Sequence, residues 1–327
     1  MNLASLLADA WARDRGARPA IGGLHRLSAG ASAQTWRFDA ELDGGTERCI
    51  AQFHAGGESF CGSLSKLDQA RAQRLAREHG VCTPEVLLVL DGDGDLPAGF
   101  VTRFVEGETL GKRIVGHPAY AQARTRLPRQ CAAQLARIHA LDADAFDFLP
   151  IRTARVQLEE LTTLHRSYGE ALPVFEAALA RLRESLPPDT APCVVHGDFR
   201  TGNLLVSADG LAGVLDWELA HRGDPLEDLA WLCLRSWRFG KVSLPVGGFG
   251  ARTDFYRAYE TASGHTLDHA ALRFWELLGT VKWGVICQSF AHRRLAGEIP
   301  GLEPAVIGRR VSEVELQVLD LLQGRGD

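Results

Sequence analysis

The residues with the clearest capacity for chemistry lie within 194–218, which reads VVHGDFRTGNLLVSADGLAGVLDWE. Asp198 comes five residues before Asn203, and Asp216 comes thirteen residues after Asn203. Two carboxylates and an amide oxygen are hard ligands, which suit Mg²⁺ better than zinc. Because Mg²⁺ keeps several waters and shares its shell with substrate phosphates, so small a set of protein ligands indicates a nucleotide substrate.

Short apolar runs and turn formers position these three side chains. The runs 194–195, 204–206 and 214–215 are typical of short strands, and turn formers around Gly202 and Gly210 separate them. The polar residues then fall at strand ends or on the loop, where side chains can converge on one point. The alternative is that Asp and Asn only cap and turn the chain here.

The same spacing resembles the catalytic loop and the metal-binding Asp of the protein kinases. Here His-Gly-Asp stands in place of His-Arg-Asp, and Asp-Trp-Glu in place of Asp-Phe-Gly. That variant resembles the aminoglycoside phosphotransferase and choline kinase branch of the kinase-like fold. HGDFRTGNLLV followed by GVLDWELAHRGDPLEDLAWL is similar to the bacterial phosphotransferase family and to the kinase-like domains of acyl-CoA dehydrogenase-linked proteins.

The resemblance assigns roles to the residues that carry it. Asp198 would be the base, and Asn203 and Asp216 would hold Mg²⁺ between the phosphates of ATP. Arg200 stands two residues after Asp198, where protein kinases place a Lys aimed at the transferring phosphoryl group. An Arg at that offset can bond phosphate bidentately. The alternative for Arg200 is a bond to Asp209 or to another surface carboxylate.

Two backbone sites for ATP follow from the resemblance. A turn rich in Gly, Ala and Ser near the N-terminus would cradle phosphate oxygens through Ser28, Gly30 and Ser32, although a simple hairpin turn explains such residues equally well. The link between the lobes would bind the adenine edge through the Arg103 carbonyl and the Val105 amide.

The clearest departure from the family lies in the N-terminal third. Relatives carry a Lys or Arg on the strand that corresponds to 46–53, paired with a Glu on the next helix. Alignment with the family places Gln52 and Gln69 at these two positions. Three explanations are open: the alignment is shifted, the phosphate charge is met elsewhere, or nucleotide binding is weak or lost. Gln forms hydrogen bonds but supplies no charge to a phosphate. Lys66 and Arg71 are nearby substitutes, although a solvated helix face is the interpretation we favour for both.

Three further residues near the motif receive supporting roles. Glu218 is a secondary candidate for a second metal ion. Asp228 is expected to bracket the catalytic loop by hydrogen bonds rather than to take part in the chemistry. His139 ends an amphipathic helix and is expected to be a packed residue.

The composition of the 327-residue chain is that of a globular protein, with 46% hydrophobic and 24% charged residues. The net charge is −5 at pH 7, and the isoelectric point is about 6.1. There is no basic stripe to indicate nucleic acid and no run of 18 apolar residues to indicate a membrane span. We therefore expect small-molecule substrates and no nucleic-acid or membrane partner.

The cysteines and the N-terminus indicate a cytoplasmic protein. The seven cysteines are scattered, and no two have the spacing of a redox or metal motif. Their odd number favours reduced thiols. The opening MNLASLLADAWARD lacks the basic and apolar regions of a signal peptide.

The sequence thus predicts an α+β, two-lobed, protein-kinase-like fold. Residues 1–105 would form an antiparallel sheet with a helix for nucleotide binding. Residues 106–327 would form a mainly helical lobe with the catalytic loop, the metal site and the acceptor pocket.

The predicted reaction is ATP- and Mg²⁺-dependent transfer of the γ-phosphoryl to a hydroxyl of a small molecule. Similarity to the acyl-CoA dehydrogenase-linked proteins favours a hydroxyacyl-CoA or a hydroxy acid as acceptor. The absence of a dense acidic cluster disfavours cationic antibiotics and choline. One alternative is a pseudokinase, a nucleotide-binding module with weak or no transfer. A hydrolase that uses Asp198 as base is disfavoured because a second carboxylate cluster is lacking.

Overall fold

The computed structural model describes residues 2–27, 33–54, 62–92 and 95–325. Its N-terminal part is a five-stranded sheet in the order β1-β2-β3-β5-β4, in which all neighbours are antiparallel. The elements of this part are α1 (Leu3–Arg15), β1 (Ala20–Arg26), β2 (Ala33–Leu42), β3 (Gly45–His54), α2 (Lys66–Glu78), β4 (Val86–Leu90) and β5 (Gly99–Arg103).

One face of the sheet packs against α1. Strands β2 and β3 form a hairpin closed by Asp43-Gly44, a residue pair that favours tight turns. Because side chains alternate along a strand, Ala51 and Phe53 of β3 point to the same face. Both are buried there in one cluster with Trp11 of α1.

The opposite face packs against α2. Gln52 of β3 lies directly across from Phe100 of β5, so the two side chains share this face. Phe100 is buried together with Ala70 of α2. Ser65 caps the helix, because its hydroxyl accepts a hydrogen bond from the amide of Asp68 at 3.0 Å. Gln52 therefore faces the helix that follows it in the chain.

The C-terminal part is mainly helical and holds two small antiparallel ribbons, β6 with β9 and β7 with β8. The ribbons consist of β6 (Cys193–Val195), β7 (Leu204–Ser207), β8 (Gly210–Val214) and β9 (His221–Gly223). The helices are α3 (Gly111–Gly116), α4 (Ala121–His139), α5 (Ala154–Ser167), α6 (Pro173–Glu184), α7 (Leu226–Leu232), α8 (Arg252–Ser263), α9 (His269–Leu295), α10 (Leu302–Gly308) and α11 (Val311–Leu322), with 3₁₀ turns at Pro118–Tyr120 and Arg235–Trp237.

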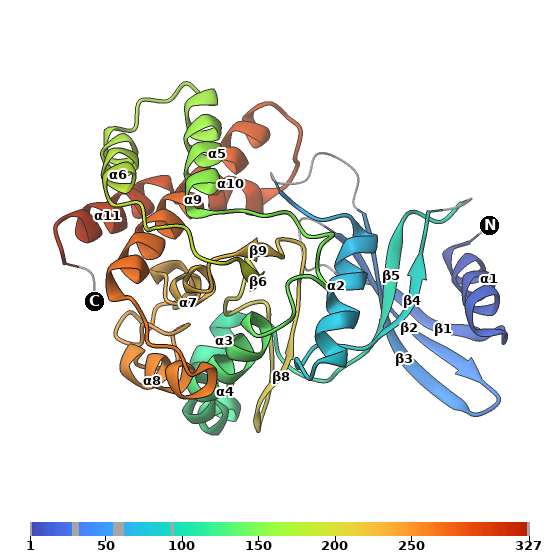
Figure 1. Cartoon of the computed structure of the whole chain (residues 1–327). Helices are drawn as coiled ribbons and strands as arrows, with labels where there is room; N and C mark the ends of the chain where they lie inside the picture. The colour runs from blue at the N-terminus through green and yellow to red at the C-terminus, as the bar shows by residue number, and fades with distance from the viewer. Residues whose placement is uncertain (1, 28–32, 55–61, 93–94, 326–327) are drawn as a thin grey trace.

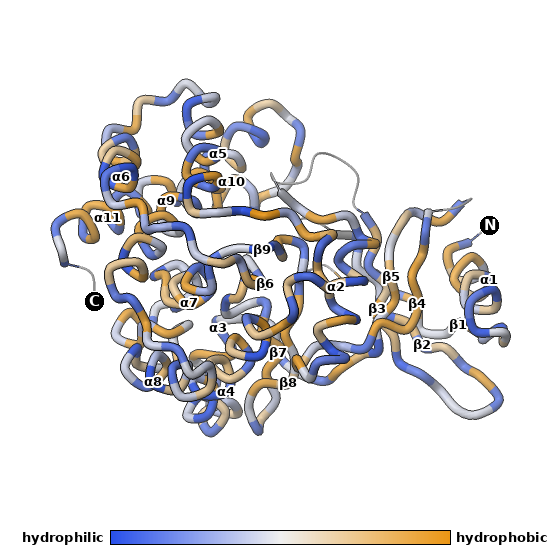
Figure 2. The backbone as a smooth tube through the Cα atoms, in the orientation of Figure 1, coloured by the Kyte–Doolittle hydropathy of each residue, from blue (hydrophilic) through white to orange (hydrophobic). Residues whose placement is uncertain are grey.

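Two apolar cores hold this part together. The first packs Leu127 and Leu135 of α4 beneath Phe199 and Leu204, so it supports the segment that carries the predicted chemistry. The second surrounds α9, which contacts α5, α6, α7, α10 and α11. In Figure 2, hydrophobic and hydrophilic residues alternate along most helices, as expected when each helix buries one face.

Figure 1 shows the sheet and α1 on one side, the helices of the C-terminal part on the other, and α2 between them. We call the sheet with α1 and α2 the N-lobe and the part from Glu108 onward the C-lobe. The chain leaves β5 at Arg103 and joins the C-lobe at Glu108, which exchanges two backbone hydrogen bonds with Val206 of β7. The predicted two-lobed α+β fold is confirmed.

Backbone and side-chain hydrogen bonds also tie the N-lobe to the end of β8 and to the segment that follows it. The amide of Leu64 donates to the Glu218 carbonyl at 2.7 Å, and the amide of Val214 donates to the Cys82 carbonyl at 2.7 Å. The hydroxyl of Thr83 donates to the Val214 carbonyl at 2.8 Å. Residues 194–218 therefore lie where the two lobes meet. Within the described part of the chain, no helix is both long and apolar enough to cross a membrane.

Candidate active site

The loop after β6 is packed tightly onto residues 215–219. Gly197 has a φ of +79°, and a Cβ added there would lie 2.3 Å from the Leu219 carbonyl oxygen, so only glycine fits. His196 is fully buried beside Trp217 and bonds the Leu215 carbonyl through Nε2 at 3.0 Å. Burial lowers the pKa of His196, so its ring stays neutral and structural.

Asp228 of α7 holds this loop in place. It is fully buried and accepts hydrogen bonds from the amides of His196 at 2.8 Å and Gly197 at 2.9 Å. His139 lies 3.2 Å from the same carboxylate, and its other ring nitrogen lies 2.8 Å from the Tyr259 hydroxyl. The predictions that Asp228 brackets the loop and that His139 is a packed residue are both confirmed.

The carboxylate of Asp198 is the centre of a dense set of donors. The side chain is 8% exposed. Arg200 Nε lies 3.0 and 3.1 Å from its two oxygens, and the amide nitrogen of Asn203 donates to Oδ2. The indole Nε1 of Trp231 donates to Oδ1 at 2.7 Å. The structure thus brings together three of the predicted site residues and fixes the orientation of the carboxylate.

Trp231 is a site residue that the sequence analysis missed. It lies on α7, three residues after Asp228, so both side chains occupy one face of the helix. The spacing from an Asp already expected to face the loop was the only available signal, since a buried Trp is usually explained by packing alone.

Arg200 lies between the base and an aromatic wall. Its guanidinium carbon is 4.6 Å from the centre of the Trp237 ring, and its Nε bonds Asp198. Asp209, which we considered as an alternative partner, instead forms an ion pair with Arg126 at 3.7 Å. The cation therefore stays beside the predicted base rather than on the surface.

Asp216 follows β8 in an unusual backbone conformation. Its φ is +64°, a left-handed value that non-glycine residues adopt rarely and most often at functional sites. Burial, followed by the carboxylates of Glu218 and Asp198, raises the pKa of Asp216 to about 7. The charges of Lys66 and Arg200 oppose this rise. Such a concentration of carboxylates favours a bound cation, which would relieve their mutual repulsion.

The predicted metal ligands fit Mg²⁺ chemistry. The amide nitrogen of Asn203 donates to the Asp198 carbonyl at 3.0 Å, which leaves the amide oxygen available as a ligand. The amide of Leu215 donates to the Asn203 carbonyl at 2.8 Å, so Asn203 lies beside the residue that precedes Asp216. Across the described residues, no three His, Cys, Asp or Glu side chains form a ready metal cage. A metal here would need phosphate oxygens and water, as Mg²⁺ does.

The two Gln residues have different surroundings. Gln69 is 3% exposed; its oxygen accepts from Lys66 Nζ at 2.8 Å and its nitrogen donates to the Leu64 carbonyl at 2.9 Å. Gln52 is partly buried on the sheet face toward α2. Our expectation that Lys66 lies on a solvated helix face is wrong, because Lys66 is only 6% exposed. Arg71 is exposed, as expected.

The predicted nucleotide contacts of the N-lobe stay predictions. The three residues of the Gly/Ala/Ser turn lie outside the described part of the chain: Ser28, Gly30 and Ser32. Arg103 ends β5, its amide donates to the Glu85 carbonyl at 2.8 Å, and its side chain points outward. Val105 lies in the segment that links the lobes.

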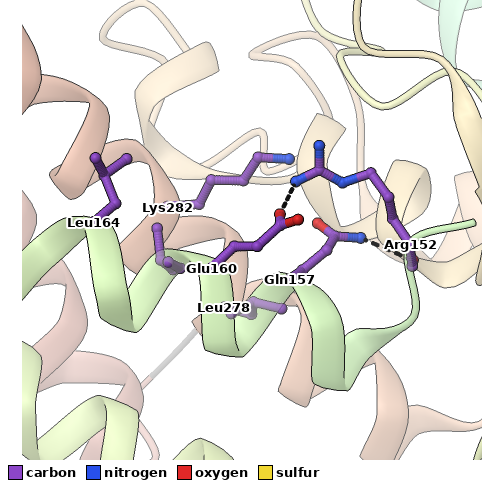
Figure 3. Close-up of a pocket in the computed structure, with 7 residues that line it drawn as sticks. Arg152, Gln157, Glu160, Leu164, Leu278 and Lys282 are labelled. Carbon is purple, nitrogen blue, oxygen red and sulfur yellow. Dashed lines mark hydrogen bonds and ion pairs between the residues drawn. The ribbon is translucent and has the colours of Figure 1, made fainter. Parts of the chain in front are cut away.

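A small hollow of about 30 Å³ lies in the C-lobe between α5 and α9. Figure 3 shows Arg152 paired with Glu160 across it, with the ammonium of Lys282 beside them. The hollow is lined by Arg152, Gln157, Glu160, Leu161, Leu164, Leu278 and Lys282.

This hollow is adjacent to the predicted base. Lys282 Nζ lies 5.2 Å from the centre of the Trp231 ring, whose Nε1 bonds Asp198. The Arg152 guanidinium also lies against Gly62 of the N-lobe. One aromatic ring therefore separates Asp198 from a hollow with two ion pairs, Arg152 with Glu160 and Lys282 with Glu227.

Comparison with known proteins identifies the family. Residues 23–275 match the family described as "Phosphotransferase enzyme family". The chain belongs to this family. The resemblance inferred from the catalytic loop is therefore confirmed.

In the curated relatives, the region that matches this chain is a segment of a longer protein. The chain is 36% identical over 113 residues to acyl-CoA dehydrogenase family member 10 of Mus musculus, a match that covers 31% of the chain and 10% of the relative. It is 32% identical over 144 residues to member 11 from the same organism, covering 41% of the chain and 18% of the relative. The chain thus spans less than a fifth of the length of these relatives.

Solved structures share the fold of this phosphotransferase. A Ralstonia eutropha protein, provisionally assigned as an aminoglycoside phosphotransferase, aligns with a TM-score of 0.77 and 18% identity over 97% of both chains. Spectinomycin phosphotransferase, solved with ADP and spectinomycin, aligns with a TM-score of 0.67 and 12% identity over 98% of this chain and 99% of that one. A choline/ethanolamine kinase family protein from Mesorhizobium loti gives a TM-score of 0.61 at 18% identity, covering 92% and 88%.

Proposed function

We propose that this phosphotransferase transfers the γ-phosphoryl of ATP to a hydroxyl of a small molecule, with residues 1–105 binding the nucleotide and residues 106–327 the acceptor. The observation that carries the proposal is the Asp198 carboxylate, which Trp231, Arg200 and Asn203 orient beside Asp216. An oriented carboxylate next to a cation site is what phosphoryl transfer to an alcohol requires.

Asp198 would orient the acceptor hydroxyl and accept its proton. Arg200 now bonds both carboxylate oxygens, so its movement toward a phosphoryl group would open a position on Asp198 for that hydroxyl. The guanidinium would then bind the charge that develops on the transferred group. Asn203 and Asp216 would hold Mg²⁺, which neutralises phosphate charge when it is bound.

The similarity to acyl-CoA dehydrogenase family members favours a hydroxy acid or hydroxyacyl-CoA as the acceptor. The hollow near Asp198 carries charges of both signs, because Arg152 pairs with Glu160 and Lys282 pairs with Glu227 at 3.3 Å. Its volume of about 30 Å³ is room for a group the size of a carboxylate.

The second candidate function is a nucleotide-binding module without transfer. The observation that favours it is the neutral pair of Gln52 and Gln69, in place of the cation and carboxylate of relatives. The two candidates differ in whether bound Mg-ATP is turned over.

Calorimetric titration with ATP, with and without Mg²⁺, followed by a phosphoryl-transfer assay on hydroxy acids and hydroxyacyl-CoA, tests the proposal. We expect Mg²⁺-dependent binding that Asp216→Ala abolishes, and transfer to an anionic acceptor. The control is Asp209→Ala, whose side chain is 94% exposed. Tight Mg-ATP binding with no transfer to any hydroxyl would favour the binding module, and no binding at millimolar ATP would exclude both candidates.

A further inference from the structure

Lys66 is a charged side chain in an unfavourable place. It is the first residue of α2 and is 6% exposed. Burial disfavours an ammonium, and the start of a helix carries partial positive charge that repels it. The chain has four lysines among 36 basic residues, so a lysine is an uncommon choice of cation here. A cost of this kind is expected where the charge serves a ligand.

The contacts of Lys66 direct it toward the site. Its Nζ donates one hydrogen bond to the neutral oxygen of Gln69 at 2.8 Å, and Gln69 is fixed in turn by the Leu64 carbonyl. The amide of Leu64 is bonded to the Glu218 carbonyl, two residues after Asp216. The ammonium has three N–H donors, and within the described part of the chain the bond to Gln69 uses one of them.

The charges around Lys66 agree with this geometry. The carboxylates of Glu218 and Asp216 act to raise the pKa of Lys66, against the larger lowering effect of burial. In the opposite direction, Lys66 acts to lower the pKa of Asp216. The ammonium therefore lies within electrostatic reach of the proposed metal ligand.

We propose that Lys66 is the phosphate-binding cation of the N-lobe, displaced from strand β3 to the first turn of α2. This rests on the proposed function. Gln52 lies on the sheet face toward α2 but carries no charge, so the charge comes from the helix instead. Gln69 anchors the ammonium without neutralising it, which leaves its full charge for the α- and β-phosphates. Arg71 is excluded because it is exposed and pairs with Asp147 at 3.7 Å.

The test measures binding of Mg-ADP, Mg-ATP and adenosine by calorimetry to wild type, Lys66→Gln and Lys112→Gln. Glutamine removes the charge and keeps a donor for Gln69, and Lys112 is an exposed lysine on α3 that serves as the matched control. We expect Lys66→Gln to bind Mg-ADP and Mg-ATP at least about tenfold more weakly, because a charge-assisted bond to phosphate is lost. Adenosine binding and the thermal midpoint should change little, and Lys112→Gln should match wild type.

A rescue variant separates a charge role from a structural one. Lys66→Gln combined with Gln52→Lys and Gln69→Glu restores the family's ion pair, and it should recover most of the lost Mg-ATP affinity. If Lys66→Gln folds and binds Mg-ATP as wild type does, the inference is wrong while the proposed function stands. If wild type itself binds no Mg-ATP, the proposed function fails. Equal weakening of adenosine and Mg-ATP would also overturn the inference, since it would indicate a damaged lobe.

Discussion

The proposed catalytic loop of the C-lobe and the proposed phosphate-binding region of the N-lobe differ in how their residues are held. In the loop, Asp198 and Asn203 keep both residue type and spacing, and each is held by directional hydrogen bonds. In the N-lobe, Gln52 and Gln69 stand where the resemblance leads us to expect a cation and a carboxylate, and Lys66 is a buried cation among the described residues. The difference follows from the interactions: a hydrogen bond requires a fixed position, whereas a charge acts over several ångströms and is more easily relocated.

The largest expected effect concerns Asp198, whose carboxylate is held in position by hydrogen bonds. Asp198→Asn keeps the shape of the side chain and removes its basicity. If Asp198 acts as the base, the rate of transfer should fall by about 10²–10⁴-fold, with the Kd for Mg-ATP within about threefold of wild type. Steady-state kinetics and calorimetry measure the two quantities, with Asp209→Asn as the control. Activity within threefold of wild type would remove Asp198 from the mechanism.

Two opposite substitutions, an acid to an amide and an amide to an acid, compare the stability of the two regions. Asp228→Asn replaces one of the two oxygens that accept the His196 and Gly197 amides, so a buried N–H is left facing a donor. We expect the free energy of unfolding to fall by at least about 2 kcal/mol, from the cost of unpaired buried groups.

The second substitution is Gln69→Glu in the N-lobe. It exchanges the bond to the Leu64 carbonyl for an ion pair with Lys66, so we expect the free energy of unfolding to stay within about 1 kcal/mol of wild type. Urea denaturation measures both variants. Equal losses of unfolding free energy in the two variants would show that the loop after β6 and helix α2 are equally sensitive to such changes. That result would contradict the comparison.

Local spacing accounts for what the sequence predicts well. Asp198, Arg200 and Asn203 share one short loop, and a tight ribbon carries the chain from there to Asp216, so their convergence follows from nearby residues. The α+β order of elements follows from strand-like and helical periodicities in the same way. The Ser/Gly turn around Gly30 is predicted on the same local basis and lies outside the described residues.

Packing between distant elements accounts for what the sequence analysis missed. The polar pattern of α2 resembles a solvated helix, yet its inward face buries Lys66, Gln69 and Gln73 alongside small alanines. Those alanines allow close approach to the sheet and leave the longer polar side chains enclosed at the meeting of the lobes. Trp231 reaches Asp198 only because α7 packs against the loop. Neither contact leaves a periodic signal in the sequence.

The smallest expected effect concerns Trp231, the long-range partner of the base. Trp231→Phe removes the indole donor to Asp198 but keeps an aromatic ring in the core. The carboxylate would then be held by Arg200 and Asn203 alone, and its looser orientation should lower kcat by about three- to tenfold, with little change in KM for ATP.

Trp237→Phe is the matched control for this change. Its ring packs 5.4 Å from that of Trp231, but among the described residues its indole nitrogen has no hydrogen-bond partner, so the same substitution removes no donor from Asp198. If the two variants lose kcat equally, the aromatic wall matters only for packing. A loss confined to Trp231→Phe would show that the orientation of the Asp198 carboxylate depends on α7 as well as on the loop itself. The proposed base would then be held from two elements, whereas Lys66, the proposed phosphate-binding cation, is held by a hydrogen bond within α2 alone among the described residues.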